Sequence, residues 1–452
     1  MLNSVLKLFS LDDIGAFSLV IGGSIIIILS YFANLLAKRT NIPSVLVLIG
    51  MGVLIRQGLS ALGMEEIPYE SLALELLGTV GLIFIVLEAA LDLELSEKKL
   101  PLILKSASLA LVSLGASTLG IAALLFYSLG LAWFTAVVYA IPLSIMSSAI
   151  IIPSVGGLSL ERKDFMVYES TFSDIWGIMA FYLVLGNQEA AGAGEVIKSI
   201  GVNLGASLII SVAVSYLLVY VLQKITSSVK LFLSIAVLIL IYSIQKLLHL
   251  SPLILILIFG LMLNNHKIFF ANIFKNKEGE SWLGRLLNDE KMAGVRHDFH
   301  LLTLESAFVI RTFFFVLFGA TVVLASLTDI EVLFYGLTIS VILYVTRFVF
   351  LRLFRPEDPF SLLYIAPRGL ITILLFFQIG SNYTELVDTS FNGGILFVVI
   401  LVTCIIMTLS LIQKGKGIEP VETNNGQSVQ LEAKDENSNL PEDAQPSEAS
   451  PE

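Results

Sequence analysis

Apolar runs of about 20 residues recur along this chain as far as residue 412, and they restrict its fold more than any motif does. A helix of that length is what is needed to cross the hydrocarbon core of a bilayer. The chain is 56% hydrophobic and only 14% charged, with a mean hydropathy of +0.88. A soluble protein of 452 residues would expose far more charge. The chain is therefore predicted to be an all-α polytopic membrane protein.

The hydropathy pattern predicts 13 membrane spans, of which the second and the ninth are short. Cytoplasmic loops carry an excess of basic residues, so Lys and Arg orient the spans. With the N-terminus outside, the inner loops hold 19 of the 27 Lys and Arg residues and the outer side holds four. The N-terminus is therefore predicted outside and the C-terminus in the cytoplasm. The spans cover residues 15–37, 43–62, 71–93, 106–128, 131–154, 165–187, 196–222, 230–248, 250–265, 300–325, 331–353, 360–380 and 391–412.

The two ends of the chain differ in composition. No opening segment has the charged region, short apolar stretch and small-residue cleavage site of a signal peptide, so none is expected. Residues 1–412 are predicted to form one transmembrane domain. Residues 413–452 hold nine acidic and three basic residues and are rich in Pro, Ser, Asn and Gln, which predicts a disordered acidic cytoplasmic tail. Cys404 is the one cysteine, so an internal disulfide is ruled out.

The segment 266–299 is the only long polar loop on the predicted inner side. Its apolar residues fit an amphipathic helix at the membrane interface, and His297 and His300 are three residues apart. No Cys or second carboxylate site accompanies them, so these histidines are interpreted as surface residues. No bound metal and no cofactor are expected beyond the transported ions. The apolar residues are Phe269, Phe270, Ile273, Trp282, Leu283, Leu286 and Leu287.

Charged side chains inside the predicted spans are the strongest indication of a functional site. A charge at the centre of a membrane helix costs about 2.5–3.5 kcal/mol on insertion scales, so each needs a partner or a function. Three acids and three arginines could neutralise one another, whereas an ion site needs one acid without a permanent partner. The alternative for Asp174 is an inert acid at a helix interface. The six residues are Glu88, Glu169, Asp174, Arg311, Arg347 and Arg368.

The sixth span contains two of these acids at a spacing that separates them. Ser170 and Asp174 are four residues apart and share one helix face, while Glu169 and Ser173 share the neighbouring face. Five residues of helix place Glu169 and Asp174 about 7.5 Å apart along the axis. This geometry suits Glu169 bound to an arginine and Asp174 facing a cavity beside hydroxyl groups. A hard cation such as Na⁺ prefers such oxygen ligands.

Two spans contain helix breakers. The fifth has Pro142 and Pro153 around Ser144, Ser147 and Ser148, and the twelfth has Pro367-Arg368-Gly369. The two spans are seven crossings apart, so they run in opposite directions. Paired interrupted helices in two inverted halves indicate the binding site of a transporter. The alternative is two unrelated proline kinks. Freed carbonyls and helix ends at such breaks can bind a cation.

Four groups of residues carry a family resemblance over about residues 15–412. Glu169-Ser170-x-x-Ser173-Asp174 resembles Glu-Ser-x-x-Asn-Asp, and Ser147-Ser148-Ala-Ile-Ile-Ile-Pro153 resembles Ser-Thr-Ala-Val-Val-Leu-Pro. The third span around Glu88 is similar to Phe-x-Glu-Gly-Gly-Leu. The segment from Arg311 to Gly319 also fits, as do Arg347 and Pro367-Arg368-Gly369. With these motifs in this order, the chain resembles the monovalent cation/proton antiporter superfamily, which includes the sodium/proton exchangers.

The resemblance implies two inverted-topology repeats with crossed, discontinuous helices, and alternating access by a homodimer in the cell membrane. It implies that Asp174 binds the cation and the proton. Ser170, Ser173 and Ser148 would be further cation ligands, and Glu88 a second acid in the site. Glu169 and Arg368 would form a structural ion pair, with Arg311 and Arg347 as further buried charges.

Two departures from the family pattern leave the transported cation open. Ser173 stands where the family has Asn, and the fifth span lacks the Asp of a Thr-Asp-Pro motif. Na⁺ is favoured, with K⁺ and Li⁺ as alternatives. The family's electrogenic branch has two adjacent acids where this chain has Ser173-Asp174, so electroneutral exchange is expected. The expected partners are the cation, the proton, the bilayer and a second copy of the chain, and no nucleic acid.

Two other classes compete with this interpretation. A membrane enzyme would need metal ligands or a nucleophile with a base, but the chain has no His-Glu-x-x-His and all four histidines lie in or near loops. A cation channel, or an ion-binding membrane protein without exchange, would also use acids and broken helices. Three buried arginines would obstruct cation conduction unless they were paired.

Overall fold

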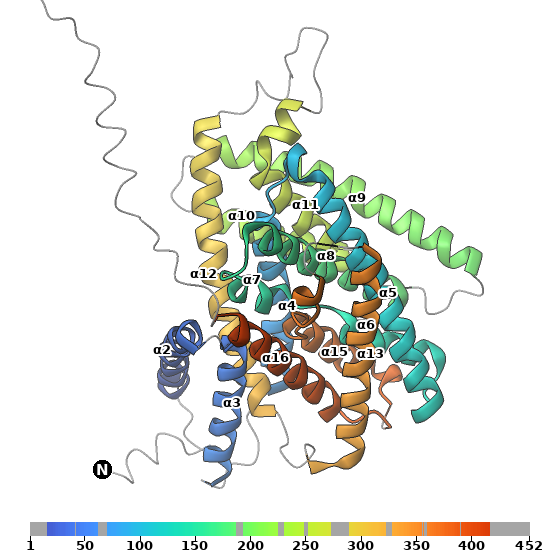
Figure 1. Ribbon diagram of the computed structural model, residues 1–452. Helices are drawn as coiled ribbons and strands as arrows, with labels where there is room; N and C mark the ends of the chain where they lie inside the picture. The colour runs from blue at the N-terminus through green and yellow to red at the C-terminus, as the bar shows by residue number, and fades with distance from the viewer. Residues whose placement is uncertain are drawn as a thin grey trace, which may run out of the picture. The chain divides into compact units, whose positions relative to one another are not determined.

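The computed structural model describes residues 16–40, 42–61, 70–186, 193–224, 230–247, 252–272, 289–321, 328–354, 356, 359–388 and 390–415. Within these ranges the secondary structure is helical, with no β-strand (Figure 1). Residues 273–288, which include most of the predicted interfacial helix, lie outside the described ranges. So do residues 416–452 of the predicted acidic tail.

Each of the 13 predicted spans coincides with a helix or a pair of helices within the described ranges. In chain order they are α2 (Ala16–Thr40), α3 (Ser44–Ala61), α4 (Glu70–Asp92), α5 (Leu100–Leu129), α6 (Trp133–Ser144) with α7 (Ser148–Ser154), α8 (Leu160–Leu185), α9 (Ala193–Lys224), α10 (Lys230–Leu247), α11 (Pro252–Asn264), α12 (Asp289–Thr321), α13 (Ile330–Phe354), α14 (Pro359–Leu363) with α15 (Leu370–Asn382), and α16 (Gly394–Gly415). Shorter helical turns cover Glu97–Lys99, Lys267–Asn272 and Thr384–Leu386.

Two helices begin well before the span that hydropathy predicts. Helix α5 begins at Leu100, because Pro101 fits only within the first turn of a helix. Helix α12 begins at Asp289, 11 residues before the predicted span. Its extra turns bury Met292, Val295 and Phe299 at helical spacing while its polar residues face outward. A hydropathy window finds only the apolar part of such a helix.

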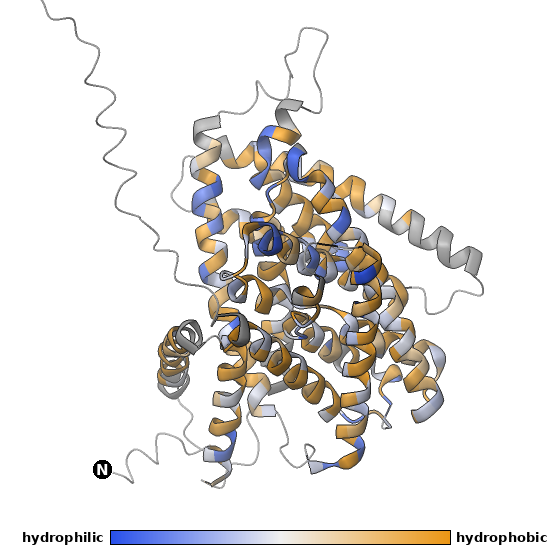
Figure 2. Ribbon diagram, in the orientation of Figure 1, coloured by the Kyte–Doolittle hydropathy of each residue, from blue (hydrophilic) through white to orange (hydrophobic). Residues whose placement is uncertain are grey.

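The helices have the composition of membrane spans. Seven described helices, with α6 and α7 taken as one, are long and apolar enough to cross a membrane, and four further apolar helices are shorter. Most residues of the described helices are hydrophobic, and hydrophilic residues gather toward helix ends such as the first described turns of α12 (Figure 2). Large apolar side chains such as Leu54 and Ile209 are exposed, as lipid contact requires. The chain is a multi-pass membrane protein.

The transmembrane helices pack in two groups, named here by their contents. The broken-helix group consists of α5, α6, α7, α8, α13, α14 and α15, which contact one another. Helix α16 joins it through the close approach of Gly336 on α13 to Val398. The scaffold group consists of α2, α3, α4, α9, α10, α11 and α12. The groups meet where α15 packs against α4.

The two interrupted helices cross within the broken-helix group. Helix α6 ends at Ser144, and the chain is extended until α7 begins at Ser148. The chain is again without helix from Ile365 to Gly369, before α15 begins. Pro367 favours an extended conformation in the residue before it. The N–H of Ser147 donates to the carbonyl of Pro367 at 2.9 Å, so the two extended segments touch. The predicted crossed, discontinuous helices are confirmed.

Candidate functional site

Helix α8 lies directly against the crossing. Gly177 makes this approach possible, because a Cβ at this position would overlap the side chain of Ile145 in the extended segment. One turn earlier on α8, the Oγ of Ser173 accepts a hydrogen bond from the N–H of Met146 at 2.9 Å. The extended segment is thereby held against α8, and Asp174 is the next residue along that helix.

Asp174 is buried at the crossing with only part of its hydrogen-bonding capacity used. Its side chain is 3% exposed, and its Oδ2 accepts the N–H of Ser148 at 3.2 Å. That N–H lies at the start of α7, where backbone donors have no helical partner. The Oδ1 atom is buried without a hydrogen-bond partner, and no ion pair joins Asp174 to another described residue. A buried carboxylate in this state calls for a cation or a proton.

The serines predicted as cation ligands are arranged differently from one another. Ser170 donates its hydroxyl to the carbonyl of Met166 at 2.8 Å, within its own helix. Ser173 holds the extended segment, and Ser148 contributes its N–H to Asp174. No role is predicted for Ser147 from the sequence, yet its buried Oγ has no hydrogen-bond partner in the described structure. Its position in the fifth-span motif is the one sequence feature that points to a role in the site. The motif does not indicate in which direction each serine hydroxyl points.

Glu169 is paired with Arg347, so the predicted pair of Glu169 with Arg368 is wrong. The Nη1 of Arg347 lies 2.6 Å from Oε1 of Glu169, and its Nη2 lies 3.1 Å from Oε2. Both side chains are buried. Arg347 also donates from Nε and Nη2 to the carbonyl of Leu362 at the end of α14, at 3.3 and 3.0 Å. It reaches Glu169 from α13, an unbroken helix of the same group.

Arg368 is occupied by backbone carbonyls. Its Nε donates to the carbonyl of Leu143 at 3.0 Å and its Nη1 to that of Ala366 at 2.8 Å. Leu143 lies in the last turn of α6, where carbonyls lack helical donors and a cation is favourable. The backbone N–H of Arg368 donates to Thr403 on α16. Arg368 therefore stabilises the crossing through its main-chain partners.

Glu88, predicted as a second acid of the cation site, is held by Arg311. The Nη2 of Arg311 lies 3.0 and 2.9 Å from the two carboxylate oxygens. Its Nη1 donates to the carbonyl of Ala149 in α7 at 3.3 Å. One turn along α4, Asp92 bonds His300 of α12 at 2.8 Å. No group of three His, Cys, Asp or Glu side chains that could hold a metal ion occurs in the described ranges.

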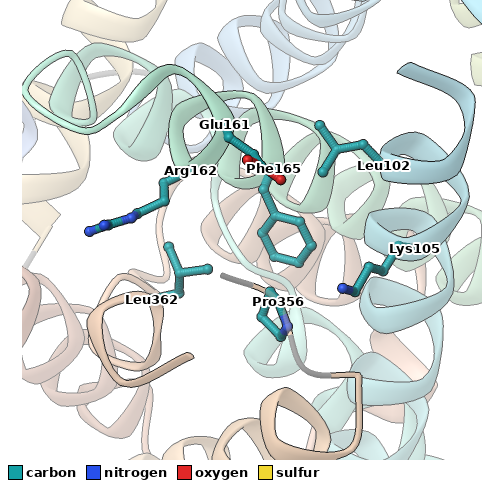
Figure 3. Close-up of a pocket in the computed structure, with 7 residues that line it drawn as sticks. All are labelled: Leu102, Lys105, Glu161, Arg162, Phe165, Pro356 and Leu362. Atoms are coloured by element: carbon teal, nitrogen blue, oxygen red, sulfur yellow. The ribbon is translucent and has the colours of Figure 1, made fainter. Parts of the chain in front are cut away.

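A separate pocket lies at the N-terminal ends of α5 and α8 (Figure 3). The distribution of Lys and Arg predicts that these helix ends face the cytoplasm. None of the residues that line the pocket belongs to the predicted cation site. One of them, Leu362, accepts a hydrogen bond from Arg347 through its carbonyl, so the pocket neighbours the Glu169–Arg347 pair. The lining residues are Leu102 and Lys105 of α5, Glu161, Arg162 and Phe165 of α8, and Pro356 and Leu362.

Crossed broken helices with a buried, unpaired carboxylate define the chain as a secondary transporter of the inverted-repeat class. The model of the transmembrane sodium/hydrogen exchanger family matches residues 24–413. The chain therefore belongs to the sodium/hydrogen exchanger family and exchanges a monovalent cation for protons. This membership identifies a transporter rather than an enzyme, and it does not favour the channel alternative.

Two solved structures, both of the sodium proton antiporter MjNhaP1 from Methanocaldococcus jannaschii, share this fold. One, at pH 8, has 16% sequence identity and a TM-score of 0.63, covering 88% of this chain and 96% of its own. The other, an electron-microscopy structure, has 18% identity and a TM-score of 0.63, covering 89% and 96%. No curated protein sequence matches the chain.

Proposed function

We propose that Asp174 is the single carboxylate that binds the cation and the proton in turn. The observation that carries this proposal is its unbonded Oδ1 in a fully buried position. The other two candidate acids inside the predicted spans are Glu88 and Glu169. Each binds an arginine through both of its carboxylate oxygens. Asp174 is thus the acid among the three whose charge is open to an exchangeable partner.

The groups around Asp174 suit a hard monovalent cation, for which Na⁺ is proposed and K⁺ and Li⁺ are the alternatives. The Oδ1 atom and the Oγ of Ser147 supply two oxygens without other partners. Ser170 and Ser173 retain acceptor capacity, because a hydroxyl has two lone pairs. Ser148 completes the proposed set beside the carboxylate. No cofactor takes part.

With one carboxylate in the cycle, cation and proton compete for the same oxygen atoms. In each cycle one monovalent cation crosses the membrane in one direction and one proton crosses in the other. The two charges are equal, so transport is electroneutral. We place the protein in the cell membrane, with its N-terminus outside and its C-terminus in the cytoplasm. We further propose a homodimer, on the strength of the sequence resemblance.

Asp174→Asn tests this function directly. In everted vesicles containing a pH-sensitive dye, the variant should show no Na⁺-induced proton movement, because the amide cannot exchange a proton or carry charge. Glu161→Gln is the control, since Glu161 is an exposed acid in the first turn of the same helix. Size exclusion and melting in detergent establish that both variants fold. Exchange by Asp174→Asn near the wild-type rate would remove Asp174 from the mechanism.

A further inference from the structure

Pro153 leaves a carbonyl of α7 without its helical donor. In an α-helix the carbonyl of Ala149 accepts the N–H four residues later, which here would belong to Pro153. Proline has no N–H, so this bond cannot form. Ala149 is buried, and an unpaired buried carbonyl is costly. The sequence of α7 therefore requires a donor from elsewhere in the fold.

Arg311 supplies that donor across the boundary between the two helix groups. It lies on α12 of the scaffold group, and its Nη1 donates to the Ala149 carbonyl at 3.3 Å. Glu88 on α4, also in the scaffold group, binds the Nη2 of the same guanidinium with both carboxylate oxygens. The scaffold thus presents a charge-neutral hydrogen-bond donor to a helix of the broken-helix group.

The contact between Arg311 and the Ala149 carbonyl lies one residue away from the group that binds Asp174. Ser148 immediately precedes Ala149, and its N–H binds the Oδ2 of Asp174. Fixing the Ala149 carbonyl therefore fixes the start of α7 and the direction of the Ser148 N–H. A lone guanidinium in this place would repel an arriving cation, and the carboxylate of Glu88 cancels that charge.

We propose that Arg311 and Glu88 are positioning residues that set the cation affinity of Asp174 without touching the cation. Arg311 orients α7 through Ala149, and Glu88 orients and neutralises Arg311. This inference rests on the proposed role of Asp174. It assigns Glu88 a role outside the cation-ligand set, and it makes the dependence on Arg311 a consequence of Pro153.

The test is a rescue experiment on reconstituted full-length protein. Glu88→Gln/Arg311→Met removes the donor without stranding a charge, and the KM for Na⁺ should rise roughly tenfold with the maximal rate nearly unchanged. Adding Pro153→Ala gives the Ala149 carbonyl an internal N–H, so the triple variant should recover a KM near that of wild type. A general packing defect would lower the maximal rate and would not be repaired at position 153.

Asp92→Asn/His300→Gln is the matched control, because it removes the neighbouring pair on the same two helices. Its KM should stay near the wild-type value. A double variant with unchanged KM, or a folded triple variant without rescue, would overturn the proposal.

If the double variant does not fold, the single variant Glu88→Gln tests the positioning role. An uncompensated Arg311 should raise the KM and keep the maximal rate, whereas an unchanged KM or abolished Na⁺ binding contradicts the positioning role. Asp174→Asn separates the two proposals. If that variant still exchanges, the proposed function fails. If it is inactive while the double variant has a normal KM, only the positioning role fails.

Discussion

Arg347 binds Glu169 and the Leu362 carbonyl with one guanidinium, its Nη1 lying 2.6 Å from Oε1 of Glu169. Arg368, which is buried, and Arg311, which is partly buried, make the same kind of backbone contact. Arg368 donates to Leu143 at the end of α6, and Arg311 donates to Ala149 in α7. Breaking a helix in the membrane leaves carbonyls that water cannot reach. Arg368 and Arg311 supply such a donor to Leu143 and Ala149, whereas Arg347 adds to the N–H of Ile365, which already binds the Leu362 carbonyl. These cations thereby stabilise the interrupted helices that form the site.

The Glu169–Arg347 pair should show strong energetic coupling in a double-mutant cycle. Arg347→Met alone strands the buried carboxylate, which costs roughly 3–5 kcal/mol in buried pairs generally. Glu169→Gln/Arg347→Met removes both charges and should recover part of that loss. Unfolding of the four proteins in detergent measures the coupling. Additive effects of the two substitutions would contradict a direct pair.

The cycle between Glu169 and Arg368 provides the contrast. Arg368→Met should destabilise the protein because the Leu143 and Ala366 carbonyls lose their donor. Its cost should be nearly the same in the Glu169→Gln background, since no hydrogen bond or ion pair joins these two side chains in the described structure. A coupling as large as that of Arg347 would restore the pair expected from sequence.

Ser147 is predicted to contribute to cation binding through its buried hydroxyl. Ser147→Ala should raise the KM for Na⁺ roughly tenfold and leave stability almost unchanged, because no existing hydrogen bond is lost. Ser144→Ala is the matched control: that buried hydroxyl already donates to the Ala140 carbonyl. The KM of each variant is obtained from exchange rates measured over a range of Na⁺ concentrations. Equal KM values for the two variants would exclude Ser147 from the site.

Gly177 should be intolerant of even one added methyl group. In Gly177→Ala the new Cβ overlaps Ile145, so the extended segment or α8 must move. Overpacking of this kind costs roughly 1–3 kcal/mol, and it would also displace Asp174 from the N–H of Ser148. Gly115→Ala on α5, where a Cβ meets no atom within 4 Å, is the control. Adding Ile145→Val should restore part of the exchange rate. Unimpaired exchange in Gly177→Ala would contradict the close approach.

The sequence was sufficient to predict the number and order of the spans and the two helix breaks, because the hydropathy pattern and the effect of proline on the backbone depend on neighbouring residues alone. Its motif and its helix face also single out Asp174 as the candidate ion-binding acid, and that role stays a prediction. The sequence could not choose the partner of Glu169, since the three arginines lie in different membrane segments and only packing selects among them. Nor could it orient Ser147, because an extended segment lacks the fixed periodicity of a helix. The dependence of Ala149 on Arg311 follows from Pro153, yet the donor itself is 162 positions away.

A single exchanging carboxylate also predicts the stoichiometry. If Asp174 binds either a cation or a proton, one leaves for each that enters, and no net charge crosses the membrane. The rate should have a bell-shaped pH dependence, because protons displace Na⁺ at low pH and become scarce at high pH. Glu88 does not add a proton in this scheme, since Arg311 holds both of its oxygens. Reconstituted vesicles clamped with valinomycin and K⁺ provide the measurement, with Na⁺ as the test ion. A rate independent of the imposed potential is expected. A rate that follows the potential would show net charge movement and a second titrating group, and Glu88→Gln would then show whether Glu88 is that group.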